Sequence, residues 1–339
     1  MVDKESERSL EEINEILTLA KLNESEIKST SQAIYFTSKN LYENNYKLLQ
    51  PDSHLLKELN VGNTLYIKGD DDEEVVICSE TQTFHVTCAE TSNSLLLVNN
   101  LLFDGDIQDG TRTVNKIEVG GVFYEYLEAV VGKPHIRKLN VLLKGSVYKG
   151  SEHEFQVDEE KLYTFEQLNN VIQASTKEIK EALSSMNVVT INGKIRLLDF
   201  EYHFRVLSYM LKLIDENSWE LDEIDYEVTL DTLSDLVPKE ILTSLFDKYT
   251  EESKIIDGLQ LYRYSEFKVC RFFAEVLLSE SGKFNLKDFL QAWKESVPEG
   301  MNPTEDMLYG VAIIDRKAHP NVIWSFDESG LPDNIIDTF

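Results

Sequence analysis

The stretch STKEIKEALSSMNVVTINGKIRLLD (Ser175–Asp199) decides how the second half of this chain folds. Its first part has helical character, because Ser175 and Glu178 have the spacing of a helix capping box. Three apolar residues recur at helical spacing and would form the buried side of that helix: Ile179, Leu183 and Met186. The spacing therefore predicts an amphipathic helix over the first half of the stretch.

A hairpin is expected directly after this helix. Asn192-Gly193 separates two short β-prone runs, and Asn-Gly is a favoured two-residue turn because both of its central residues need a positive φ. The same pattern returns 65 residues later with Asp257-Gly258, and residues 191–211 align with residues 256–276 without a gap. A repeat of this length indicates one small structural unit used more than once.

A third, looser copy follows in the segments NLKDFLQAW, PTEDMLYG and NVIWSF, whose final hairpin is expected to be short and to lack its return strand. The pattern of each copy predicts three helices followed by a hairpin, which is the order of elements in a winged helix. The expected fold class is therefore α+β. The expected domains are a 1–45 arm with an amphipathic helix, a 46–133 β-rich subunit-assembly domain, and winged helices at 134–199, 200–264 and 265–339.

The β-rich domain is expected to contain about five short strands between Tyr46 and Val98 and another within 119–130. A small sheet leaves strand edges and an apolar face uncovered, so a partner can add strands to it. The residues expected to contact such a partner are Tyr66, Val76, Phe84, Val86, Leu95 and Leu97.

The composition limits the function further. The chain has 339 residues, a net charge of -28 and three cysteines, and its start lacks the features of a secretory signal. No apolar run is long enough to cross a bilayer, so a membrane association is not expected. An excess of acid opposes binding to nucleic acid phosphates, and a DNA contact would need a local basic surface.

The sequence carries no motif that predicts catalysis. The glycine-rich phosphate loops, HExxH and GxSxG are all missing from it. Cys78, His85 and Cys88 are near one another in sequence, but strand alternation places His85 on the face opposite Cys88. We therefore expect no enzyme, no cofactor and no metal site.

The charged residues of the repeats favour protein docking over DNA binding. The helix within 175–187 should present Lys177, Lys180, Glu181 and Ser184 to solvent, and its charges cancel. No side chain suited to reading a base edge lies in its first turn. The residues left as candidate DNA contacts are Lys194, Arg196, Arg263, Lys268 and Arg271.

Two strings carry a family resemblance: AETSNSLLLVNN (Ala89–Asn100) and WKESVPEGMNPTEDMLYGVAIIDR (Trp293–Arg316). Both resemble the Dcc family of sister chromatid cohesion proteins, accessory subunits of the alternative, cohesion-type replication factor C clamp loader. The resemblance runs from about residue 46 to about residue 330, and the first 45 residues are expected to be a lineage-specific arm.

The resemblance implies a nuclear, non-catalytic subunit that acts with its complex on the sliding clamp PCNA in DNA replication and cohesion. Its β domain would join a small companion subunit and the tail of a large ATPase subunit, and through them the replication factor C small subunits. Its winged helices would engage the catalytic subunit of DNA polymerase epsilon and could contact DNA. Two alternatives remain at this point: a DNA-binding tandem winged-helix regulator, and a winged-helix scaffold unrelated to replication.

Overall fold

The computed structural model describes residues 8–23, 25, 27, 30–36, 46–106, 114–280, 283–317 and 321–325. They divide into two compact units. Unit 1 holds the residues up to 134 together with 173–175, and unit 2 holds 135–172 and the residues from 176 onward. Helices and sheets both occur, which confirms the mixed class expected from the sequence. None of the described helices has the length and apolar character needed to cross a membrane.

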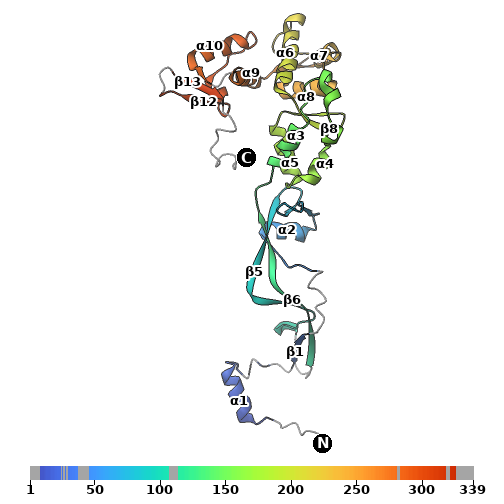
Figure 1. Cartoon of the computed structure of the whole chain (residues 1–339), viewed down its shortest axis with the longest axis vertical. Helices are drawn as coiled ribbons and strands as arrows, with labels where there is room; N and C mark the ends of the chain where they lie inside the picture. Colours follow the sequence, from blue (N-terminus) through green and yellow to red (C-terminus); the bar gives the residue numbers. More distant parts are fainter. Residues whose placement is uncertain are drawn as a thin grey trace. The chain divides into compact units, whose positions relative to one another are not determined.

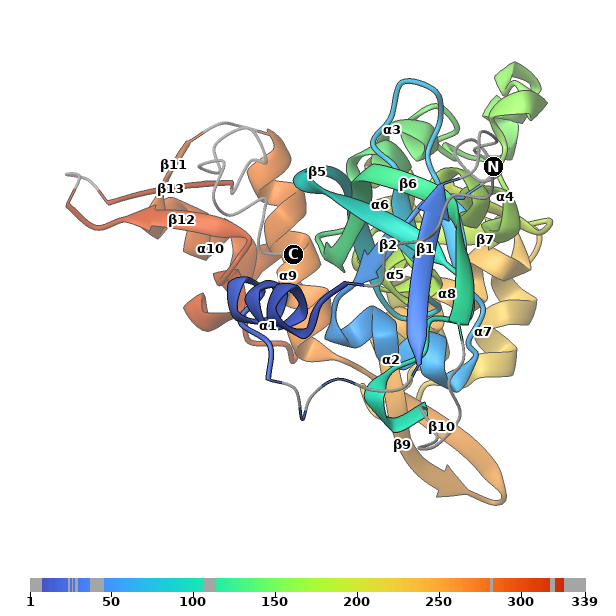
Figure 2. The same cartoon turned by 90° about the horizontal axis from the view of Figure 1, so that it is seen from below.

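Unit 1 is built on one sheet with the strand order β1-β6-β5-β4-β3, and β2 also pairs with β6 (Figure 1; Figure 2). β5 and β6 are long antiparallel strands, while β1 and β2 both run parallel to β6. The elements of unit 1 are α1 (Leu10–Leu19), β1 (Ser31–Phe36), β2 (Leu49–Pro51), α2 (Ser53–Val61), β3 (Tyr66–Lys68), β4 (Val76–Cys78), β5 (Thr83–Val98), η2 (Asp104–Asp106) and β6 (Val114–Val131).

Several of these elements differ from the expectation. The predicted strands TFHVTCA and SLLLV are one 16-residue strand, β5, and β1 is a strand that the sequence patterns did not indicate. The helix α2 was also not expected. It begins after Asp52, whose carboxylate accepts from the backbone N–H groups of His54 and Leu55, and it ends at Gly62 with φ 81°. α1 is the amphipathic helix expected in the arm, and it begins with a capping box in which Ser9 Oγ accepts from Glu12 N–H and Glu12 Oε2 accepts from Ser9 N–H.

Unit 1 has a core cluster between α2 and the sheet. Leu55 of α2 packs with Ile77, Phe84 and Ala129 of the sheet. Residues 173–175 complete this unit. The buried Lys68 donates to the carbonyl of Ala174 at 2.6 Å, and Ser175 N–H donates to Thr83 Oγ1 at 2.9 Å.

Unit 2 contains three successive sets of helices and a hairpin. The first set is α3 (Arg137–Lys144), η3 (Ser151–Gln156), η4 (Glu159–Lys161), α4 (Phe165–Val171), α5 (Thr176–Ser185), β7 (Val188–Ile191) and β8 (Lys194–Leu197). The second is α6 (Phe200–Asn217), α7 (Tyr226–Leu233), α8 (Lys239–Tyr249), β9 (Thr250–Ile256) and β10 (Leu259–Tyr264). The third is α9 (Glu266–Glu280), β11 (Phe284–Asn285), α10 (Leu286–Ser296), η5 (Glu305–Leu308), β12 (Ala312–Asp315) and β13 (Val322–Ser325).

The hairpin turns of the first two sets agree with the sequence. Asn192, Gly193, Asp257 and Gly258 all have positive φ, between 50° and 84°. Both predicted two-residue turns are thus confirmed.

The sets also share a feature that the sequence did not indicate. The residue or strand before the second helix pairs with the last strand of the hairpin in each set. These pairs are Tyr163 with Ile195, Ile224 with Tyr262, and β11 with β13.

The helix and hairpin boundaries require two corrections. The first winged helix is expected to begin at residue 134, but the first helix of unit 2 begins at Arg137, three residues later. The third hairpin does not lack its return strand, because β12 pairs with β13 in antiparallel register. The third helix of the last set is only the 3-10 turn η5.

One hydrophobic core runs through all three sets, from Tyr148 to Ile323. His203 of α6 is fully buried where the sets meet, and its ring stacks on Phe272 with centroids 4.2 Å apart. His203 Nε2 is 2.9 Å from the hydroxyl of Tyr249. Burial, and to a lesser degree the charge of Lys248, lowers the pKa of His203 to about 3.

This buried histidine predicts a loss of stability in mild acid. The unfolded chain takes up a proton at this residue below about pH 6.5, while the folded chain keeps it neutral down to about pH 3. When the pH is lowered from about 7.5 to about 5, the free energy of unfolding should fall in wild type by about 2 kcal/mol more than it falls in the variant His203→Gln. Urea denaturation at both pH values measures this difference. The variant His54→Gln, at an exposed histidine, should follow wild type; identical pH dependence in all three proteins would contradict the expectation.

Candidate partner-binding surfaces

The outer edge of β5 is a long stretch of open backbone in the described part of unit 1. β4 covers this edge only from Thr83 to His85, and Val86 N–H donates to the carbonyl of Val75 at 3.3 Å. In the described part of the chain, no strand pairs with the same edge from Thr87 to Val98. Free backbone N–H and C=O groups on a long strand are a template for another strand.

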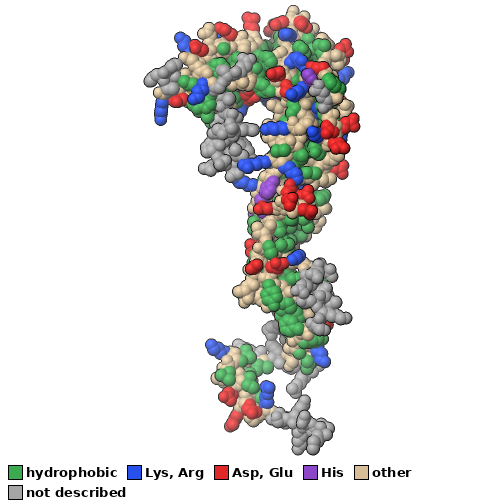
Figure 3. All heavy atoms as spheres, viewed as in Figure 1, with side chains coloured by type: hydrophobic (Ala, Val, Ile, Leu, Met, Phe, Trp, Pro, Cys, Tyr) green, Lys and Arg blue, Asp and Glu red, His purple; other side chains and the backbone are tan. Residues whose placement is uncertain are grey.

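The ribbon of β5 and β6 also leaves apolar side chains uncovered. Leu96 is 41% exposed and Tyr124 is 62% exposed, and Leu95 beside them is exposed as well. Hydrophobic side chains therefore remain visible along this ribbon in Figure 3. Exposed apolar side chains on a strand with an open edge make this ribbon a candidate interaction site.

An irregularity interrupts the pairing in the middle of the ribbon. Glu90 faces Glu125 and Leu95 faces Phe123, so residues 91–94 stand opposite Tyr124 alone. Such bulges bend a strand and redirect its side chains, and they are frequent near functional sites. Beside this bulge lies a recess of about 330 Å³, lined by Tyr46, Lys47, Glu90, Thr91 and the segment 122–125.

The charges at the bulge are compensated locally. Two glutamates directly opposite one another repel, but Lys47 Nζ lies 2.6 Å from Glu125 Oε1. The hydrogen bond and charge of Lys47 lower the pKa of Glu125. The Cys88 thiol donates to the same carboxylate at 3.6 Å.

The residues predicted to contact a partner in unit 1 fall into two groups. Tyr66 and Leu95 are exposed, and Val86 and Leu97 are half-buried. Val76 and Phe84 are completely buried, so they support the sheet from inside and are corrected here to core residues. The prediction also omits Leu96 and Tyr124, although the unbroken apolar run LLLV was a signal that this strand has two apolar faces.

The three side chains considered for a metal have separate partners. Cys78 is buried with its sulfur 3.7 Å from Thr83 Oγ1. His85 Nε2 lies 2.7 Å from the carbonyl of Lys133. Cys88 is exposed and points to Glu125.

The outer face of α5 in unit 2 has the composition expected from the sequence. Lys177, Lys180, Glu181 and Ser184 are all exposed, while Ile179 and Leu183 are buried beneath them. Lys177 Nζ is 3.8 Å from Glu181 Oε1, and Lys180 lies over the ring of Phe165. The face is therefore polar and close to neutral.

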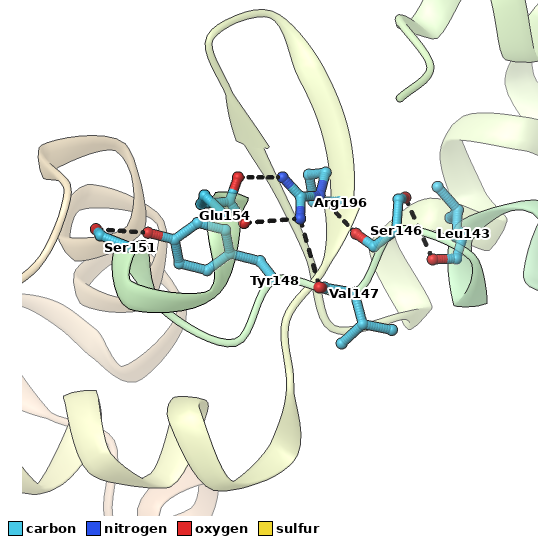
Figure 4. A network of polar contacts seen from close by, with 7 residues as sticks. All are labelled: Leu143, Ser146, Val147, Tyr148, Ser151, Glu154 and Arg196. Carbon is cyan, nitrogen blue, oxygen red and sulfur yellow. Dashed lines mark hydrogen bonds and ion pairs between the residues drawn. The ribbon is translucent and has the colours of Figure 1, made fainter. Parts of the chain in front are cut away.

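Arg196 requires a correction, because it cannot serve as a surface contact to DNA. Its side chain is only 2% exposed and forms a two-pronged ion pair with Glu154, at 2.9 and 3.0 Å (Figure 4). Its Nε donates to the carbonyl of Ser146, and its Nη2 donates to the carbonyl of Val147. The guanidinium group thus fastens the segment after α3 to the hairpin strand β8.

The other candidate DNA contacts are mostly paired with acids or with the backbone. Lys194 is half-buried and donates to the carbonyl of Leu162 at 3.2 Å. Arg263 pairs with Glu251 at 3.3 Å and Arg271 with Glu275 at 3.6 Å, while Lys268 is exposed. The structure does not gather these residues into one basic surface with Arg196, which is buried in its own hairpin.

The hydrogen bonds and ion pair of Arg196 predict that its replacement destabilises unit 2. Arg196→Ala should lower the free energy of unfolding of unit 2 by about 3 kcal/mol, because it leaves buried carbonyls and Glu154 without their donor. Arg263→Ala is the matched control, since it removes a hairpin arginine whose ion pair is mostly exposed, and it should cost less than about 1 kcal/mol. Chemical denaturation of the full chain measures both values. Equal losses for the two variants would show that Arg196 has no special structural role.

Comparison with known proteins places these surfaces in a family. The sequence model of the family described as "Sister chromatid cohesion protein Dcc1" matches residues 46–339. The chain is 33% identical to sister chromatid cohesion protein DCC1 of Xenopus laevis over 335 residues, covering 98% of this chain and 85% of that protein. It is 33% identical to the DCC1 protein of Mus musculus over 340 residues, with the same coverage.

A more distant relative agrees with this result. The probable sister chromatid cohesion protein DCC1 of Dictyostelium discoideum is 26% identical over 299 residues, covering 82% of this chain and 75% of that protein. The vertebrate alignments span nearly the whole chain, so they extend into the first 45 residues, and the expectation of a lineage-specific arm is wrong. The chain belongs to the Dcc1 family of sister chromatid cohesion proteins.

Proposed function

We propose that this chain is a non-catalytic subunit of an alternative replication factor C clamp loader. In this role it acts in the nucleus with its complex on PCNA, during DNA replication and sister chromatid cohesion. Membership of the Dcc1 family supports the cohesion role, because the relatives carry it in their names. The Dcc1 family is one of cohesion proteins and is not a known enzyme family.

One observation supports the proposed role in assembly of the complex. From Thr87 to Val98, β5 offers a free backbone edge in the described structure, next to exposed apolar side chains. Between Ala89 and Leu97 the described sheet is only two strands wide, because β1 and β2 pair with β6 on either side of this stretch. A two-stranded ribbon is only marginally stable in water, whereas three or more strands with a covered apolar face are stable. Strands from the small companion subunit and from the tail of the large ATPase subunit would supply the missing neighbours.

Unit 2 provides the outward contacts in this proposal. We infer that its three sets of elements are winged helices, which is supported by the order of helices and hairpin and by the extra strand pair that recurs in each set. The near-neutral face of α5 favours a protein partner, and we assign it to the catalytic subunit of DNA polymerase epsilon. Contact with DNA is secondary, because Arg196 is buried and Arg263 and Arg271 are paired with glutamates.

Assembly through β5 is tested by a pair of matched variants. Leu96→Lys places a charge on the open ribbon, where an added strand would bury it, and should reduce recovery of the complex by about tenfold or more, which corresponds to about 1.4 kcal/mol. Leu59→Lys changes a leucine of similar exposure on α2, 43% against 41%, and should assemble normally. The measurement is co-expression with the companion subunit and the ATPase tail, followed by quantification of the purified complex.

The result depends on comparing the two variants. Both chains should be equally folded when expressed alone, as judged by circular dichroism. Complex formation that is equal for Leu96→Lys and wild type would remove the β5 ribbon as the assembly surface.

A further inference from the structure

The recess beside the β5 bulge combines an aromatic ring with an excess of acid. It has a volume of about 330 Å³ and is lined by Tyr46, Lys47, Glu90, Thr91 and residues 122–125. Tyr46 is 52% exposed, and Glu90 and Glu125 are exposed as well, so a ligand in the recess reaches these groups from solvent. All of the lining residues belong to unit 1.

The charges that line this recess do not balance. Glu90 and Glu125 are cross-strand partners, so they project from the same face of the ribbon, where like charges destabilise the pairing. Lys47 compensates only one of them, because its ammonium group lies 2.6 Å from Glu125. In the described part of the chain no cation pairs with Glu90. Two carboxylates against one ammonium group leave the recess with one negative charge.

The open edge of β5 brings a side chain of an added strand to this recess. Glu90 and Thr91 belong to the part of β5 that has no outer neighbour among the described strands. A strand added there places one residue opposite Glu90, with its side chain on the same face and the Cβ atoms about 4.5–5.5 Å apart. A long cationic side chain at this position reaches the carboxylate of Glu90.

The lining favours arginine over lysine. A guanidinium group is planar, pairs with a carboxylate through two N–H groups and stacks on an aromatic ring. Glu90 supplies the carboxylate, and Tyr46 supplies an exposed ring at the same recess. The ammonium group of lysine is a compact, strongly hydrated charge that gains less from these surroundings.

We propose that this recess binds an arginine side chain carried by the strand that adds to β5. The guanidinium group pairs with Glu90, lies against the ring of Tyr46 and cancels the remaining negative charge. The proposal rests on strand addition to β5, the role proposed above, and it names the chemistry by which the chain selects the correct strand. A glutamate that weakens the ribbon in the free chain thus becomes a specificity contact in the complex.

Peptide binding to the full chain tests this selectivity without any companion subunit. The probe is the fluorescently labelled peptide Val-Thr-Val-Arg-Val-Thr-Val, and the matched peptide carries citrulline, a neutral isostere, in place of arginine. Titrations followed by fluorescence anisotropy should show that the arginine peptide binds about fivefold more tightly, which corresponds to about 1 kcal/mol. Equal affinities for the two peptides, or no binding of the arginine peptide up to its solubility limit, would overturn the proposal.

Three variants locate the contact. Glu90→Gln removes the carboxylate and should abolish the preference for the arginine peptide, while the citrulline peptide should bind as it does to wild type. Lys47→Met removes the competing cation and should increase the preference. Glu118→Gln changes the net charge equally at an exposed glutamate elsewhere on β6 and should keep the wild-type preference. All three side chains are exposed, so the variants should be as folded as wild type by circular dichroism.

Wild type, Glu90→Gln and the two peptides form a double-mutant cycle that isolates the contact. A preference that is unchanged in Glu90→Gln, or that fails to rise in Lys47→Met, would overturn the arginine site. An equal loss of preference in Glu118→Gln would overturn it too, because it would show attraction to the net charge of -28 alone. The peptides contain no companion sequence, so normal recovery of the complex together with an absent preference would refute only the arginine site.

Discussion

Backbone hydrogen bonding of β6 is the constraint on which unit 1 depends. This 18-residue strand pairs with β5 along one edge and with β1 and β2 along the other, so three strands are organised around it. One core cluster of unit 1 lies around Leu55 and Phe84, and Ile117, Val119 and Phe123 are buried further along β6. Main-chain pairing with β6 joins these parts of the sheet, and the part of β5 without an outer neighbour in the described structure is where a partner contributes most.

In unit 2, apolar side chains are buried between the sets of elements as well as within each set. A unit near 65 residues buries too little apolar surface to be very stable alone, and here three such sets share one core. His203, Tyr249 and Phe272 come from α6, α8 and α9 and meet in the same cluster. The packing between sets is thus as important to the fold as the packing within each set.

The sequence predicts the local features well because their causes are local. Turns at Asn192-Gly193 and Asp257-Gly258 follow from the φ values that these residues tolerate, and the cap at Ser9 follows from its spacing to Glu12. The continuity of β5 through a bulge and the pairing of β1 depend on partners far along the chain, which single-strand patterns do not show.

The environments of the candidate site residues also depend on partners that are distant in the sequence. Arg196 looks like a surface cation in a hairpin, and its actual partner, Glu154, lies 42 residues away in sequence. Phe84 lies on a sheet face with Ile77, but the strand pattern does not say whether α2 or another protein covers that face. The outward face of α5 is placed well because its amphipathic pattern determines it alone.

The continuous core of unit 2 has a consequence for reading genetic variants. Ile323 of the final hairpin is fully buried, and Trp293 of α10 is buried with its indole N–H donated to the carbonyl of Cys270 in α9. A premature stop before β13 would uncover apolar surface that belongs to the neighbouring sets. Such an allele would act through the abundance of the whole protein, by exposing it to quality control, and its phenotype would not report the role of the last hairpin alone.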